Sequence, residues 1–297
     1  MARKISIKGA LRKACLESAI HVSPKGYLDS FLDNIYCNAM SDEHQQMFNC
    51  GSGKELKTKA KALHSSSMLG YNFFSWIDES HPFVWDGVTY TKVYFEVRLR
   101  TIKRSPAPAN MDIVLDGMKD GHRVLLFIES KFLEYTNHGK LELSEAYMTP
   151  KNYYNGSWNY VAYELRIETH KTNHYNEGLK QSFCHLVALN ALKSPKALNW
   201  FNTNNVLQIK NLDDVEIRFT NAIFYPRNDF ESEYGKYKDY EEFYKWFMGF
   251  IASVAPYSVQ PGWCSYSELW RQMRNQISDT NRKAFLERRY IDFAEKC

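Results

Sequence analysis

Long apolar runs are missing from this sequence of 297 residues, which argues against a membrane protein. No run approaches the ~20 apolar residues that a membrane-spanning helix needs. The first thirteen residues carry basic side chains with no apolar segment behind them, which argues against a secretory signal peptide. We therefore expect a cytoplasmic protein.

Paired cysteines and nucleotide-binding motifs are missing as well. The six cysteines are scattered without CxxC spacing, so we expect no zinc site and reduced thiols. No GxxxxGK(S/T) motif indicates ATP use, and no GxSxG motif indicates an α/β hydrolase. Cys184 and His185 are neighbours within an expected helix, and we interpret both as packing or surface residues.

The composition that remains is ordinary for a globular protein, with a slight excess of basic charge. Hydrophobic residues make up 44% of the chain and charged residues 24%, which allows a substantial core. The formal net charge of +4 permits nucleic-acid binding without requiring it. Aromatic residues reach 15%, and their side chains can either pack in a core or stack on bases.

Helical patterns occupy both ends of the chain and one segment between the strands. Apolar residues recur there at the spacing of one helical face. The segment 141–175, rich in Tyr and Asn, has weak periodicity, so we expect it to be irregular or partly helical. The expected helices are 5–48 with a new segment at Ser23-Pro24, 54–77 at least to Gly70, 175–192, 238–254, and 265–293 with a break near Ser278-Asp279.

The centre of the chain switches to strand character. Residues 83–99 predict a hairpin with an Asp-Gly turn, and residues 110–134 predict a second hairpin turning within 116–121. Residues 215–226 predict a buried strand closed by proline. The helix over 175–192 connects the second hairpin to this strand, which should therefore join the sheet in parallel. We expect an α/β fold whose mixed sheet is flanked by helices.

The second hairpin places ionisable residues in an apolar stretch. Side chains alternate between the faces of a strand, so Glu129 and Lys131 share one face and Ser130 points to the other. Charges are rarely placed deep in an apolar strand without a partner or a metal. Pairing of the two strands should bring Asp112 beside Glu129.

This combination of residue types suits phosphodiester chemistry. Two carboxylates on neighbouring strands form an oxygen-rich site of the kind that Mg²⁺ prefers. A bound metal generates hydroxide from water and neutralises charge on a phosphoryl oxygen. Lys131 would orient the water or stabilise the charged transition state. Glu96 interrupts an apolar run on the preceding strand, and is either a further carboxylate of the metal site or a surface residue on an edge strand.

At these residues the sequence resembles the PD-(D/E)XK nuclease superfamily, with Asp112 as the Asp and Glu129-Ser130-Lys131 as the ExK element. Pro108 lies upstream of Asp112, not directly before it as in the motif. Within the superfamily, residues 60–290 are similar to a restriction-endonuclease-like branch. The segments that carry this similarity are SSSMLGYNFF (65–74), YFEV (94–97), FLE (132–134), LKQSFCHLVAL (179–189), a strand ending in Tyr225-Pro226, and AFLERRY (284–290).

The resemblance implies a set of site residues and a cofactor. Asp112, Glu129 and the backbone carbonyl of Ser130 would bind Mg²⁺, for which Mn²⁺ can substitute. Lys131 would position or activate water. Glu96 would be an extra acid of the site, and a glutamine would reach it from the following helix. The implied catalytic set is Glu96, Asp112, Glu129, Lys131 and Gln181.

The resemblance also implies an organisation and an activity. Residues 1–53 would be a helical N-terminal region packed on a restriction-endonuclease-like catalytic unit of residues 54–297. The activity would be Mg²⁺-dependent endonucleolytic hydrolysis of DNA, of the restriction or defence type, with double-stranded DNA favoured. A homodimer is plausible, because cutting both strands of a duplex usually takes two sites.

Two other functions stay open on the sequence alone. One is a repair or phage-type nuclease that acts on ends, on branched DNA or on RNA. The other is a nucleic-acid-binding protein with an inactive nuclease fold, against which the intact ionisable residues argue. The sequence does not rank the segments that would read bases, namely the Lys103-Arg104 loop, residues 150–175 and the N-terminal third.

Overall fold

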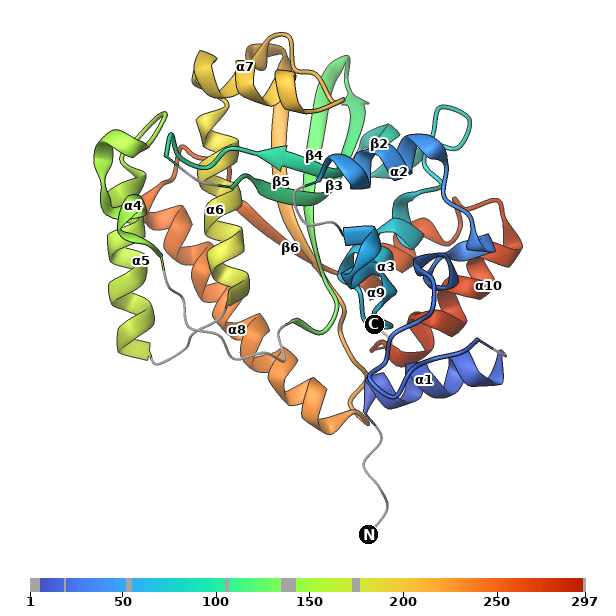
Figure 1. Cartoon of the computed structure of the whole chain (residues 1–297). Helices are drawn as coiled ribbons and strands as arrows, with labels where there is room; N and C mark the ends of the chain where they lie inside the picture. Colours follow the sequence, from blue (N-terminus) through green and yellow to red (C-terminus); the bar gives the residue numbers. More distant parts are fainter. Residues whose placement is uncertain are drawn as a thin grey trace.

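The computed structural model describes residues 6–18, 20–51, 55–104, 107–134, 143–172 and 177–295. These residues form a six-stranded sheet whose strands lie side by side in the order of the chain (Figure 1). The strands are β1 Phe83–Trp85, β2 Val88–Leu99, β3 Ala109–Lys119, β4 His122–Lys131, β5 Val215–Ile223 and β6 Pro261–Ser265.

Helices surround this sheet. The α-helices are α1 Ile7–Glu17, α2 Asp42–Cys50, α3 Ser66–Phe74, α4 Glu145–Met148, α5 Trp158–Thr172, α6 Glu177–Ala191, α7 Pro195–Asn204, α8 Glu231–Val254, α9 Tyr266–Met273 and α10 Thr280–Arg289. Helices α4, α5, α6 and α8 lie on one side of the sheet, and α3, α9 and α10 lie on the other (Figure 1). No helix within the described residues has the length and apolar character to cross a membrane.

Both expected hairpins are confirmed. Strands β1 to β4 pair antiparallel with their neighbours. The turn residues Asp86-Gly87 and Asp120-Gly121 all have positive φ, 51° and 72° in the first turn and 49° and 81° in the second. Two-residue hairpin turns of this type require positive φ at both positions, which Asp-Gly adopts readily. The second turn therefore sets the register that brings the ends of β3 and β4 together.

The parallel half of the sheet follows from helical crossovers. Helices α4 to α7 lie between β4 and β5 in the chain, and α8 lies between β5 and β6. Both strand pairs, β4–β5 and β5–β6, are parallel. The expected parallel arrangement of the strand within 215–226 is thus confirmed, and the fold is α/β with a mixed sheet.

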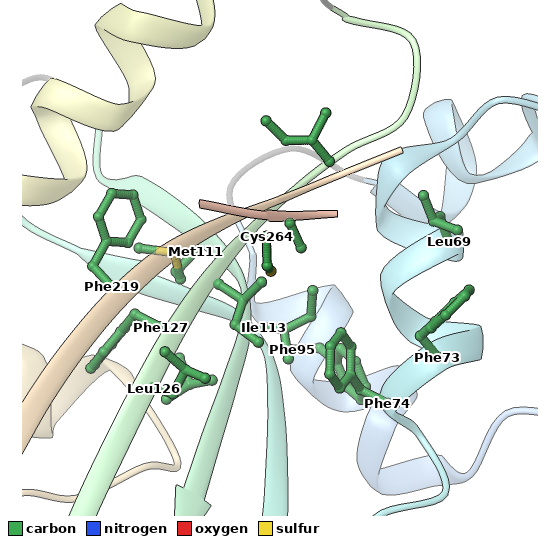
Figure 2. Packing of buried hydrophobic residues seen from close by; sticks show 14 of the residues in the cluster. Leu69, Phe73, Phe74, Phe95, Met111, Ile113, Leu126, Phe127, Phe219 and Cys264 are labelled. Atoms are coloured by element: carbon green, nitrogen blue, oxygen red, sulfur yellow. The ribbon is translucent and has the colours of Figure 1, made fainter. Parts of the chain in front are cut away.

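Close packing against α3 covers one face of the sheet. A Cβ atom on Gly70 would lie 2.6 Å from Ile113 Cδ1 and 3.5 Å from Ser130 Cβ, so the helix backbone approaches β3 and β4 directly. Around this contact, aliphatic and aromatic side chains fill the space between helix and sheet. Figure 2 shows Leu69, Phe73 and Phe74 of α3 across from Phe95, Ile113 and Leu126 of the strands, whereas Phe127 and Phe219 lie on the other face of the sheet.

The prediction of helix throughout residues 5–48 is wrong between α1 and α2. That stretch holds only short 3₁₀ turns, at Phe31–Asn34 and Tyr36–Asn38. The Asn34 side chain donates to the carbonyls of Ala60 and Ala62, at 2.9 and 2.7 Å. These contacts with a distant segment replace the hydrogen bonds that a helix would make, although the apolar spacing is helical.

The prediction of a helix over residues 54–77 is also wrong in its first half. Short 3₁₀ turns occupy Glu55–Lys57 and Lys59–Lys61, and α3 starts only at Ser66. Ser65 is the N-cap residue, whose hydroxyl accepts from the Met68 N–H. Serine favours this position because it satisfies an otherwise free N–H of the first turn. The three consecutive serines therefore mark a helix start.

The remaining predictions differ from the structure mainly in extent. The segment 141–175 is partly helical as expected, and the break near Ser278-Asp279 separates α9 from α10. The predicted starts at 5, 54 and 175 lie outside the described residues. The sequence predicts neither α7 nor β6, and α8 begins at Glu231, seven residues before its predicted start at 238. Further 3₁₀ turns lie at Pro150–Asn152, Leu212–Asp214 and Ile291–Phe293.

Candidate functional site

Three acidic residues lie at one level across β2, β3 and β4. The β2–β3 pairing on both sides of Glu96 places that residue opposite Asp112. The β3–β4 register, continued by one residue beyond the pair Ile113–Ile128, places Asp112 opposite Glu129. Residues directly opposed in an antiparallel pair project from the same face. The strands thus bring Asp112 and Glu129 together as the sequence predicts.

Glu96 has an irregular backbone. Its φ is +52°, in the left-handed region that residues other than glycine rarely adopt. Its side chain is 6% exposed, and Oε2 accepts a hydrogen bond of 3.0 Å from Asn110 Nδ2. Such a conformation costs about 1–3 kcal/mol and persists only where the surroundings enforce it. The structure therefore holds Glu96 inside the site and does not place it on an exposed edge.

Asp112 is tied to the backbone of the neighbouring strand. The Ser130 N–H donates to Asp112 Oδ2 at 2.7 Å. Because a strand residue directs its N–H and C=O to the same side, the Ser130 carbonyl also faces β3, beyond the last paired residues. The Ser130 hydroxyl points to the opposite face, where it donates to Ser66 O and contacts Tyr266 OH at 2.6 Å.

Lys131 is buried between two oxygen atoms. Its Nζ donates to Glu129 Oε1 at 2.5 Å and to Gln181 Oε1 at 2.6 Å, which joins β4 to α6. Burial by itself would lower the pKa of Lys131, but the charges of Glu129, Glu134 and Asp112 raise it above its ordinary value. Lys131 is therefore a cation held in a fixed position.

His185, which the sequence predicts to be a packing or surface residue, lies in the site. Its Nδ1 lies 3.4 Å from Glu129 Oε2, and its Nε2 lies 3.1 Å from the Asn110 carbonyl oxygen. Burial lowers its pKa, although the charge of Glu129 opposes that shift. The available signal was the spacing of Gln181 and His185, because residues four apart lie on one face of a helix.

Glu55 is a second missed residue. It is 7% exposed, and its Oε1 accepts a hydrogen bond of 3.0 Å from the Ser67 hydroxyl. Burial raises its pKa. No sequence signal distinguishes Glu55 from the exposed charges of the lysine-rich segment around it.

Each acidic residue of the site disfavours ionisation of its neighbours, which raises their pKa values. Burial, and then the charges of Glu129 and Glu96, raise the pKa of Asp112 well above its ordinary value. Burial, with the charge of Glu55 as the next cause, raises the pKa of Glu96 to about 8. A cation bound among these groups would favour their ionised forms. The electrostatics of the site therefore suit a positively charged ligand.

These residues open onto a cleft of about 740 Å³. The cleft lies between the start of α3, the ends of β2 to β4, and α6. Its lining combines carboxylates with basic and hydroxyl side chains, so both an ion and a polar substrate fit its chemistry. Residues at the cleft include Glu55, Lys59, Ser67, Glu96, Asp112, Glu129, Lys131, Glu134, Lys180, Gln181 and His185.

The donor set fits a hard divalent cation. Across the described ranges, no three His, Cys, Asp or Glu side chains are grouped closely enough to hold a metal. Mg²⁺ needs fewer, because it commonly binds one or two carboxylates and keeps several waters. Glu129 Oε2 is buried without a hydrogen bond to any described residue. Together with Asp112 and the Ser130 carbonyl, it supplies the oxygen atoms that such an ion requires.

Comparison of the chain with protein-family models, with curated proteins and with solved structures finds no match. Function is therefore inferred from the residues of the cleft. The features that bear on function are the two carboxylates, the buried ammonium group and the hydrogen bonds that hold them.

Proposed function

We propose that the protein is a Mg²⁺-dependent DNA endonuclease of the PD-(D/E)XK type, acting in restriction or defence. The observation that carries this proposal is the meeting of Asp112, Glu129 and Lys131 at the ends of two adjacent strands in one cleft. The combination of two carboxylates and one ammonium group suits hydrolysis of a phosphodiester.

The order of the elements supports the finer proposal of a restriction-endonuclease-like core. An antiparallel hairpin, β3–β4, carries the acidic residues, and a crossover helix then leads to the parallel strand β5. Gln181 of that helix contacts Lys131, as the resemblance implies for the glutamine. The contact between helix and hairpin builds the site from elements distant in sequence.

Asp112, Glu129 and the Ser130 carbonyl would hold the metal. A bound Mg²⁺ supplies an activated water and neutralises charge that develops on the phosphoryl oxygens. Lys131 is held by Glu129 and Gln181, so its ammonium group can donate to the attacking water or to a phosphoryl oxygen without reorganising. Burial of these groups excludes bulk water and strengthens each of these interactions.

The cleft rim offers a surface suited to nucleic acid. The Lys103 N–H donates to the Asn152 carbonyl at 2.8 Å, and Lys103 Nζ to the Lys151 carbonyl at 3.2 Å. Thr101 and Tyr147, which line the cleft, are hydrogen-bonded at 3.1 Å. Two of the segments that the sequence left unranked for DNA contact therefore form one surface. Its exposed lysines suit phosphate groups, and Tyr154 beside Lys103 suits a base.

The test is incubation of circular plasmid and linear DNA with the protein, with and without Mg²⁺, followed by sequencing of the product ends. The proposal expects Mg²⁺-dependent cleavage of the closed circle, which has no ends. Products that shorten only from the ends of linear DNA would instead support an exonuclease. DNA binding without cleavage in any divalent metal would contradict a nuclease and support the binding protein.

A further inference from the structure

Two buried atoms of the cleft face each other without a hydrogen bond. His185 Nδ1 and Glu129 Oε2 lie 3.4 Å apart, and the side chains are 2% and 3% exposed. Neither atom forms a hydrogen bond with any residue that the structure describes. Leaving a buried polar atom unpaired is unfavourable, because the atom loses its hydrogen bonds to water. A ligand that both atoms bind would remove this cost.

The other ring nitrogen of His185 determines which ligand fits. Nε2 lies 3.1 Å from the Asn110 carbonyl oxygen, which can only accept a hydrogen bond. Nε2 must therefore carry the proton, and a neutral ring then leaves a lone pair on Nδ1. The opposite tautomer would set two acceptors against each other at Asn110. A protonated Nδ1 would be expected to donate to Glu129, yet the two atoms lack hydrogen-bond geometry.

This arrangement is that of a metal-binding histidine. Such residues usually donate the second ring N–H to a backbone carbonyl or carboxylate, which fixes the tautomer and the ring orientation. The Asn110 carbonyl fills that role here. Asn110 is itself anchored, because its side chain donates to Glu96.

The separation of the two atoms fits ligands of one ion. Bonds of about 2.1 Å to nitrogen and oxygen, meeting at roughly 90–110°, place the donor atoms about 3.0–3.4 Å apart. Nδ1 and Oε2 are 3.4 Å apart. Both residues also line the cleft.

We propose that His185 Nδ1 and Glu129 Oε2 form a chelating pair for a divalent transition metal, which makes the cleft prefer Mn²⁺ to Mg²⁺. Imidazole nitrogen is a ligand for transition metals, whereas Mg²⁺ takes oxygen almost exclusively. The pair supplies two side-chain ligands, in keeping with the lack of any three-residue group among the described residues. Mn²⁺ bound by this pair would take the place that Mg²⁺ has in the proposed nuclease, and the pair rests on that function only for what the ion then does.

The test measures metal binding without DNA. Mn²⁺ is titrated into the protein and free Mn²⁺ is followed by electron paramagnetic resonance. Pulsed measurements on the bound ion then detect the coupling of a coordinated imidazole ¹⁴N. We expect this coupling in the parent protein and its loss in His185→Gln, whose amide can still donate to Asn110. The variant should bind Mn²⁺ at least about tenfold more weakly, while Mg²⁺ affinity changes little.

His64→Gln is the matched control, because His64 lines the same cleft and its Nδ1 is also buried without a hydrogen bond to the described residues. It should keep the ¹⁴N coupling. Mn²⁺ binding by the parent without nitrogen coupling would overturn the proposal and needs no variant to observe. No Mn²⁺ binding, or loss of the coupling in His64→Gln only, would overturn it too.

The result is separable from the nuclease proposal. A protein that binds Mn²⁺ through His185 and cuts no DNA in any metal keeps the chelating pair and contradicts the nuclease. A protein that cuts DNA with Mg²⁺ and shows no nitrogen coupling keeps the nuclease and contradicts the chelating pair.

Discussion

The backbone N–H of Ser130 donates a hydrogen bond of 2.7 Å to the carboxylate of Asp112. This bond links β4 to β3 just beyond the last residues of their ladder. It orients the Asp112 carboxylate without using its whole hydrogen-bonding capacity, since a carboxylate has about four acceptor positions. The Asp112 side chain is therefore held in place while it remains able to bind a further ligand on the cleft side.

The packing of α3 on the sheet gives a prediction about stability. Relative to Gly→Ala at an open helical position, Gly70→Ala should lower the free energy of unfolding by about 1–3 kcal/mol, because the new Cβ would lie 2.6 Å from Ile113 Cδ1 and 3.3 Å from its Cγ1 and the Ile113 side chain would have to move. Chemical denaturation measures this. Gly249→Ala on α8 is the control, since a Cβ there meets nothing within 4 Å, and it should stabilise by about 0.5–1 kcal/mol. Equal effects of the two substitutions would contradict the close approach.

The raised pKa of Glu96 gives a prediction about pH. Its folded-state pKa is about 8, above the ordinary value of about 4.3, so the folded protein binds this proton more tightly. The corresponding stability is present below about pH 4.3 and is lost as pH rises towards 8. Glu96→Gln removes this dependence.

Denaturation at pH 5 and pH 8, without divalent cations, measures the effect. The unfolding free energy of Glu96→Gln relative to the parent should rise between the two values. Glu216→Gln, which replaces an exposed residue on β5, is the control. If the unfolding free energies of Glu96→Gln and the parent differ by the same amount at both pH values, the result would contradict the burial of an acid at this position.

The contact between Lys131 and α6 gives a prediction about rate. Gln181→Ala removes one of the two acceptors that hold Lys131, so DNA cleavage should fall by about tenfold. Lys131→Ala should cause a larger loss of at least about 100-fold, because it removes the cation itself. Single-turnover cleavage measures both. Gln272→Ala, at an exposed position on α9, should cleave like the parent. A Gln181→Ala rate equal to that of the parent would exclude a positioning role.

The rim of the cleft gives a prediction about DNA binding. Lys103→Ala combined with Lys151→Ala should weaken binding and reduce its dependence on salt, by about 0.9 in log–log slope for each phosphate that the two lysines neutralise. Affinity is measured across a salt series without metal. The control combines Arg271→Ala and Arg288→Ala, exposed residues of α9 and α10. Equal losses of affinity in the two double variants would indicate a general charge effect and no defined surface.

Local signals explain which parts of the fold the sequence predicted. The Asp-Gly turns fix two hairpins over short distances, and alternation within β4 identifies Glu129 and Lys131 as one face. The apolar spacing within 175–192 predicts helix α6. The position of this helix between the second hairpin and the next strand predicts a crossover. These features depend on neighbouring residues only.

The missed features depend on contacts between distant segments. The stretch between α1 and α2 has helical apolar spacing, but Asn34 binds carbonyls near residue 60 instead of its own turn. His185 enters the site because α6 packs against β2, β3 and β5. Glu55 enters it because the Ser67 hydroxyl donates a hydrogen bond to its carboxylate. Periodicity indicates which face of a helix is buried, but not what lies opposite that face.

The most direct test of the nuclease site compares Asp112→Asn with Asp116→Asn, the same change at two positions of β3. The amide oxygen introduced by the first change can still accept from Ser130, whereas Asp116 pairs with Arg123 and is not among the residues lining the cleft. Cleavage of supercoiled plasmid with Mg²⁺ is measured beside DNA affinity. We predict that Asp112→Asn loses at least about 100-fold in rate while binding DNA, and that Asp116→Asn cleaves like the parent. Cleavage by Asp112→Asn at the parent's rate would contradict the proposed site.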